Sequence, residues 1–152
     1  MRSKVSLVGL LLILLAVNLS VALKEKALAS GRTVILELVP VDPRSLMQGD
    51  YMRLRYAVPK GDALPEGSGL TYVQVDSRNV AIALSSKPGP GLVALRYRKR
   101  ETEVALDAES YFFEEGHGFL FDKAKYGELR VDAGGTPILV RLLDSKLTPI
   151  TP

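Results

Sequence analysis

The 152-residue sequence contains no cysteine, no tryptophan and a single histidine. Without cysteine the chain forms neither a disulfide framework nor a thiolate metal site, so its apolar interior alone must hold the fold together. This absence does not assign a compartment, because an oxidising environment permits disulfides without requiring them. The formal net charge is only +3 at pH 7, which favours at most a mild attraction to an anionic lipid surface.

Motifs of familiar chemistry are also absent: there is no phosphate-binding loop, no dinucleotide fingerprint and no Ser-His-Asp arrangement. The histidine, His117, follows Glu114-Glu115-Gly116 and precedes a second glycine. One imidazole beside adjacent carboxylates lacks the spacing that brings three ligands to one centre, so we expect neither a metal ion nor a cofactor. The basic run Arg96–Arg100 is typical of the solvent face of a strand, and we expect no nucleic acid partner.

A long apolar run opens the chain. Val5–Leu23 holds about 19 residues without a charge, which is enough to cross a bilayer as a helix. Basic residues flank both ends, so the positive-inside bias is slight. Because a signal-anchor is generally followed by one folded domain, we expect residues 1–4 in the cytoplasm, 5–23 in the membrane, 24–32 as a linker and 33–152 as an extracytoplasmic domain.

A cleaved signal peptide is the alternative interpretation of this run. Ala27-Leu28-Ala29 supplies a small-x-small cleavage site, with cleavage after Ala29. Two observations favour an uncleaved anchor instead. The charged cluster Lys24-Glu25-Lys26 lies between the run and that site, and the run is longer than a typical signal-peptide core.

The remainder of the chain shows short runs in which apolar and polar residues alternate, the pattern of half-buried strands. One segment, Phe119–Tyr126, is predicted to be helical and to end at Gly127. Ala133–Thr136 is predicted to be a hairpin turn. Many short strands with Gly/Pro turns predict an all-β domain, a small barrel or sandwich of antiparallel strands, preceded by one transmembrane helix. The predicted strands are Thr33–Val39, Tyr51–Tyr56, Thr71–Val75, Val80–Leu84, Leu92–Arg100, Thr102–Leu106, Tyr111–Glu114, Glu128–Val131 and Ile138–Leu142.

The most specific segment combines a loop with the strand that follows it. Asp42 and Pro43 favour a turn, and Arg44 is placed to form a carboxylate fork with Asp42 or Asp50. In the following strand Met52, Leu54 and Tyr56 share one face, so Leu54 and Tyr56 are most simply core residues. Tyr51 shares the other face with two arginines. It is either an exposed contact for a ligand or partner, or a partly buried ring covered by arginine stems.

The pattern Gly49-Asp50-Tyr51-x-x-Leu54-x-Tyr56 resembles the GDYXXLXY family of bacterial proteins. The resemblance extends to Pro40-x-Asp42-Pro43-Arg44 upstream and to Tyr111–Gly116 downstream. It implies a membrane-associated protein without an assigned activity, supports an extracytoplasmic domain at the cell (inner) membrane, and suggests a multi-spanning membrane protein as partner. The motif residues expected to bind that partner are Asp42, Pro43, Arg44, Gly49, Asp50, Tyr51, Leu54 and Tyr56.

Two functional classes remain after these comparisons. The first is a non-catalytic accessory or binding module, which we favour. The second is a cell-envelope hydrolase that uses the loop carboxylates Asp42, Asp50 or Glu115 for general acid and base work. Signal peptidases share a Leu-x-x-Gly-Asp turn, similar to Leu46–Asp50, but the position of their nucleophile corresponds here to Val41. That substitution argues against a peptidase.

Overall fold

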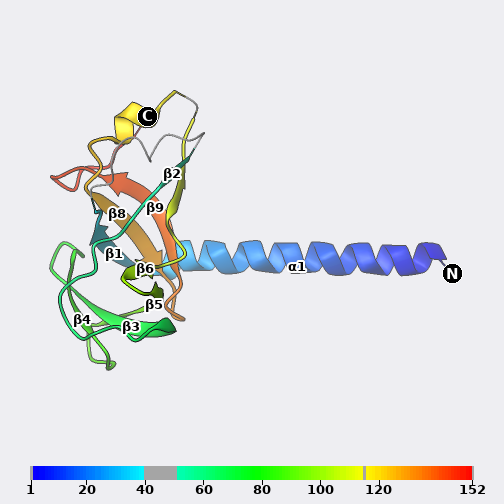
Figure 1. Ribbon diagram of the computed structural model, residues 1–152. Helices are drawn as coiled ribbons and strands as arrows, with labels where there is room; N and C mark the ends of the chain where they lie inside the picture. The colour runs from blue at the N-terminus through cyan, green and yellow to red at the C-terminus, as the bar shows by residue number, and fades with distance from the viewer. Residues whose placement is uncertain (1, 40–50, 115, 152) are drawn as a thin grey trace.

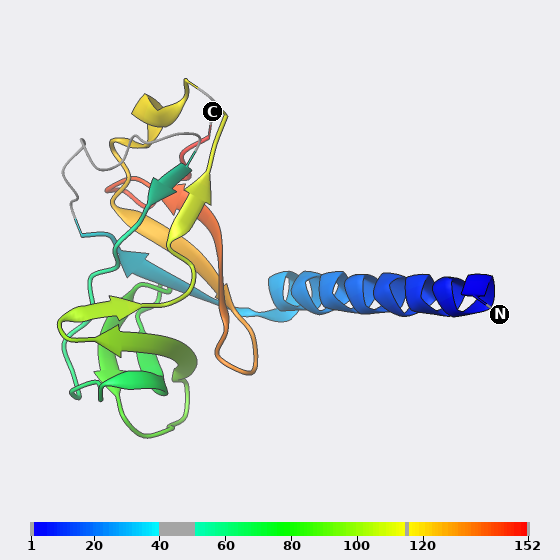
Figure 2. The ribbon, with the colours of Figure 1, turned by 45° about the vertical axis from the view of Figure 1, so that its right-hand side comes forward.

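The computed structural model describes residues 2–39, 51–114 and 116–151. Within these ranges the chain forms one long α-helix, nine β-strands and one short 3-10 helix. The helix projects from the β domain as a single rod, with the N-terminus at its far end (Figure 1). The view in Figure 2 shows the strands wrapped into a half-open shape beside the helix root. An all-β domain preceded by one apolar helix is therefore confirmed.

The helix α1 extends over Arg2–Ser30. Its segment Ser6–Ser30 is long and apolar enough to cross a membrane, and its leucine side chains are exposed along the rod. The stretch predicted as a linker, 24–32, is helical as far as Ser30 and enters the first strand at Arg32. The helix thus leads into the β domain with Gly31 alone between the two elements.

The strands form three antiparallel sheets, and each predicted strand is present with its ends shifted by a few residues. The first sheet has the order β1 (Arg32–Glu37), β8 (Tyr126–Val131), β9 (Pro137–Leu143); the second pairs β2 (Tyr51–Arg53) with β7 (Ser110–Phe112); the third has the order β4 (Ala81–Ser85), β3 (Gly67–Val75), β5 (Val93–Arg100), β6 (Glu103–Ala105).

The apolar faces of these sheets share one core. Val34 of β1, Val73 of β3 and Leu129 of β8 belong to one cluster and are fully buried. Each such side chain contributes about 1.5–3 kcal/mol through removal from water. The predicted alternation in β5 is also confirmed, because Val93, Leu95 and Tyr97 are buried while Arg96 and Arg98 on the other face are exposed.

Three turns are closed in the same way by an aspartate. In each, the aspartate Oδ1 accepts hydrogen bonds of 2.8 or 2.9 Å from the amides two and four residues later. The residue three positions after the aspartate has a positive φ, and its amide donates to the aspartate carbonyl. One of them is the predicted hairpin turn between β8 and β9. The pairs are Asp76 with Asn79, Asp132 with Gly135, and Asp144 with Leu147.

The predicted helix over Phe119–Tyr126 is wrong. A 3-10 helix covers only Gly118–Phe121, and β8 begins at Tyr126. Gly127 therefore lies inside a strand, where a Cβ would be 3.0 Å from Cε1 of Tyr56. The glycine makes room for an aromatic ring and does not end a helix.

Candidate binding surface around the motif strand

Five of the motif residues lie outside the described residues: Asp42, Pro43, Arg44, Gly49 and Asp50. The same holds for Glu115. The described part of the motif begins with Tyr51, whose register partner in β7 is Phe112. The predicted strand Tyr51–Tyr56 ends early, at Arg53, because the chain then leaves β7, and Tyr56 forms an isolated bridge with Leu38, just past the end of β1.

Leu54 and Tyr56 are core residues, as predicted, with 4% and 6% of their surface exposed. The Tyr56 hydroxyl donates a buried hydrogen bond of 2.6 Å to the carbonyl oxygen of Ala108. Burial raises the pKa of this hydroxyl, and the carboxylate of Glu109 raises it further, so the group stays protonated and serves as a donor. These two motif residues therefore hold the fold.

The segment 106–109 lies against the motif strand and is fixed by several polar contacts. The amide of Leu54 donates to the carbonyl of Glu109 at 2.7 Å, and the Glu109 carboxylate accepts from the amide of Leu106. Between them Asp107 has a φ of 57° and forms an ion pair of 3.2 Å with Arg98. The motif strand and this segment thus form one connected unit.

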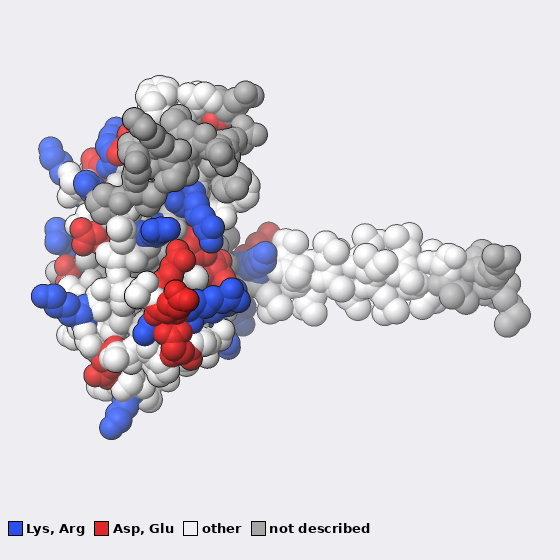
Figure 3. Space-filling model, in the orientation of Figure 1, with Lys and Arg blue, Asp and Glu red and all other residues white. Residues whose placement is uncertain are grey.

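The outward-facing side chains of the motif strand line a groove of about 180 Å³ beside β5 and β6. Two of its arginines have ion-pair partners: Arg55 lies 3.6 Å from Glu103, and Arg98 is paired with Asp107. The other two, Arg53 and Arg100, have no carboxylate within 4.0 Å among the described residues. Basic and acidic side chains lie side by side on this face (Figure 3).

Two aromatic side chains near the motif strand face solvent. Phe112 of β7 is 73% exposed and Phe119 of the 3-10 helix is 63% exposed. The two neighbours of Phe112 in the chain turn inward, since the rings of Tyr111 and Phe113 lie 5.1 and 5.4 Å from the buried ring of Phe121. Sequence reasoning missed Phe112 because three consecutive aromatic residues conceal the strand alternation that assigns each to a face.

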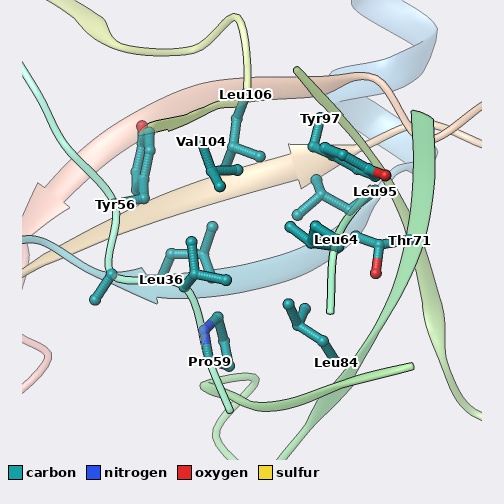
Figure 4. Close-up of a pocket in the computed structure, with 12 residues that line it drawn as sticks. Leu36, Tyr56, Pro59, Leu64, Thr71, Leu84, Leu95, Tyr97, Val104 and Leu106 are labelled. Carbon is teal, nitrogen blue, oxygen red and sulfur yellow. The ribbon is translucent and has the colours of Figure 1, made fainter. Parts of the chain in front are cut away.

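A small, partly open pocket lies between β1, the segment that begins at Tyr56 and the sheet of β3 to β6 (Figure 4). Leu36, Tyr56, Leu95 and Tyr97 contribute to its apolar wall. Its volume is about 20 Å³, which is room for roughly one water molecule. The pocket is therefore too small for an organic substrate.

The described residues contain no group of three or more His, Cys, Asp or Glu side chains placed to hold a metal ion. His117 Nδ1 is 3.5 Å from Glu114 Oε2 and makes no hydrogen bond. The amide of Ser86 donates to Asp62 and lowers the pKa of that carboxyl, and similar bonds act at Asp76 and Asp144. A general acid at neutral pH requires the opposite shift. Gly116, just before His117, has a φ of 82°, in the left-handed region that favours glycine.

Comparison with known proteins identifies the chain through its family alone. No curated protein and no solved structure matches it. The family model described as GDYXXLXY protein matches residues 13–142, most of the helix and nearly all of the β domain. The chain therefore belongs to the GDYXXLXY family.

Proposed function

We propose that this protein is a single-pass, membrane-anchored binding module without catalytic activity, whose β domain lies outside the cytoplasm and binds a multi-spanning membrane protein. The helix α1 supplies the anchor, since Ser6–Ser30 has the length and composition of a membrane span. We place it in the cell (inner) membrane. The binding surface is the outer face of the β2–β7 ribbon together with the adjacent arginine groove.

The exposure of Phe112 is the observation that carries this proposal. A phenylalanine that is 73% exposed on a strand leaves most of its apolar surface in water, where a partner could cover it. Aromatic and arginine side chains are the residues most enriched at the energetic centres of protein interfaces. Here Arg53, two residues beyond Tyr51, the register partner of Phe112, has no ion pair within the described part of the chain.

Site-specific photocrosslinking in membranes tests the proposal. A photoreactive phenylalanine analogue is placed at position 112 of the full-length protein, and in a second sample at Ile82. Ile82 is the control because it is 50% exposed on β4, in a different sheet. We expect position 112, and not position 82, to capture one multi-spanning membrane protein.

The same capture is repeated with arginine and motif variants that remain folded. Arg53→Gln with Arg100→Gln is expected to reduce the yield at position 112, because both charges face the groove. Arg44→Ala with Tyr51→Ala tests the predicted motif residues in the same way. Equal products from positions 112 and 82, or no membrane protein at either, would contradict the proposed binding surface.

A further inference from the structure

The junction between α1 and the β domain is tightly built. Ala27 is only 8% exposed, and a Cβ at Gly31 would lie 2.3 Å from the Ala27 carbonyl oxygen and 3.0 Å from that of Val131. The guanidinium of Arg130 donates to the Gly31 carbonyl at 3.1 Å. On the other side, Arg32 donates to the carbonyls of residues 91 and 92 at 2.9 and 3.0 Å. The domain therefore has a fixed place next to the end of the helix.

If α1 crosses a bilayer, the β domain begins at the depth of the lipid headgroups. The apolar run ends at Leu23, and the four residues to Ala27 advance the helix by about 6 Å. Each headgroup layer is roughly 5–7 Å thick beyond the hydrocarbon. Since Ala27 already packs against the domain, the domain must begin within the headgroup layer.

The surface at this depth is hollow and basic. A recess of about 610 Å³ lies between Leu23 and Lys26 on the helix and Val131 to Gly134 on the domain. Where the helix meets the domain, basic side chains lie beside an acidic one (Figure 3). The cationic collar, as we name it, consists of Lys24, Lys26, Arg32, Arg96 and Arg130.

The cationic collar forms no ion pair among the described residues, although Glu25 lies between two of its lysines in the sequence. None of its five side chains has an ion-pair partner within 4.0 Å among the described residues. Its three arginines donate to backbone carbonyls, including a bond of 2.9 Å from Arg96 to Gly134. The carboxylate of Asp132, which also lines the recess, accepts bonds from its own turn.

We propose that the recess and the cationic collar bind headgroups of anionic phospholipid in the bilayer that α1 spans, so that the β domain rests on the membrane surface. The proposal depends on the membrane anchoring of α1 given above. Two observations support it. The five cations of the collar, which have no ion pair among the described residues, complement the charge of phosphate, and the recess begins beside Leu23, at the end of the apolar run.

The absence of cysteine makes a direct test possible, because a single introduced cysteine carries the only thiol. Ala133→Cys places a fluorophore on the exposed tip of the β8–β9 turn, which lines the recess. Ser145→Cys is the matched control, since it occupies the same position of the Asp144 turn at the opposite end of β9. The full-length protein is reconstituted in bilayers whose phosphatidylcholine carries a nitroxide on its headgroup.

We expect the fluorophore at position 133 to be quenched several-fold more than the one at 145, and more strongly when phosphatidylglycerol is included. Lys24→Gln with Lys26→Gln should remove most of that phosphatidylglycerol-dependent increment. Equal quenching at the two positions, or none that depends on phosphatidylglycerol, would overturn the proposal. So would suppression of the increment by inorganic phosphate, which would indicate a site for the free anion.

Anchoring is tested separately by extraction of the same membranes with alkaline carbonate. A protein that resists extraction but shows equal quenching retains its anchor and lacks the headgroup contact. A protein that is extracted lacks the anchor itself, which would overturn both the anchoring and the headgroup contact.

Discussion

The hydroxyl of Tyr56 and the carbonyl of Ala108 are joined by a buried hydrogen bond of 2.6 Å. The bond connects the last residue of the family motif to the segment that precedes β7. The same segment accepts the amide of Leu54 through the Glu109 carbonyl. The motif strand is thus fixed through the backbone amide of Leu54 and the hydroxyl of Tyr56, while Arg53 and Arg55 between and beside them are exposed.

Tyr56→Phe should lower the free energy of unfolding by about 1–3 kcal/mol, because it leaves the buried Ala108 carbonyl without a donor. Urea unfolding of the full chain in detergent, followed by circular dichroism, measures this change. Tyr72→Phe is the control, since Tyr72 is only half-buried and its hydroxyl has no hydrogen bond within the described structure; it should change stability by less than about 0.5 kcal/mol. Equal effects of the two substitutions would contradict the role of the Tyr56 bond.

Gly127→Val should destabilise the protein by about 1–3 kcal/mol through overpacking, since the new side chain meets the ring of Tyr56 and Cδ1 of Leu139. The thermal midpoint of the full chain measures the loss. Valine at Ser68, an exposed position in β3, controls for the residue type and should have little effect. If Gly127→Val melts with the wild type, the contact with Tyr56 is not tight.

The strands were predictable because the alternation of β5 and β8 depends only on neighbours in the sequence. The helix error at Gly127 has a different origin. Glycine fits both a helix end and a strand position under an aromatic ring, and the ring that decides between them belongs to Tyr56, which is distant in the sequence. Sheet order has the same limitation, because the placement of β8 between β1 and β9 is a long-range pairing.

The candidate site was predictable in part. The burial of Leu54 and Tyr56 follows from the strand period, and so does the exposure of Arg53 and Arg55. The exposure of Phe112 depends on which side of β7 meets the ring of Phe121, a contact made by a segment without periodic pattern.

The aspartate-closed turns predict a specific loss of stability in acid. Backbone amides lower the pKa of Asp76 and Asp144 below the ordinary value of 3.8. The unfolded chain therefore binds protons more readily at these groups, so their contribution is present above pH 3.8 and is lost as the pH falls through the lowered pKa. Asp76→Asn with Asp144→Asn should flatten this acid dependence of the thermal midpoint. If the thermal midpoint of this variant depended on pH as in the wild type, the two aspartates would not be the source of the acid sensitivity.

Gly31→Ala should loosen the junction of α1 and β1, because the added methyl group would collide with the backbone carbonyls of Ala27 and Val131. We expect a stability loss of about 1–3 kcal/mol and faster amide hydrogen exchange around residues 27–32. Gly89→Ala is the control, since its methyl group would meet only the flexible side chain of Leu92. Unchanged exchange at the junction in Gly31→Ala would show that the close approach does not constrain it.

The direct passage from α1 into β1 also has a mechanical meaning. With Ala27 and Gly31 held against Val131, the helix and the domain lack the slack of a flexible tether. Tilt or rotation of the helix then acts as a lever on the whole domain and changes where the outer face of the β2–β7 ribbon points. A change in bilayer thickness, or in the packing of α1 against another helix, would therefore reorient the outer face of the β2–β7 ribbon.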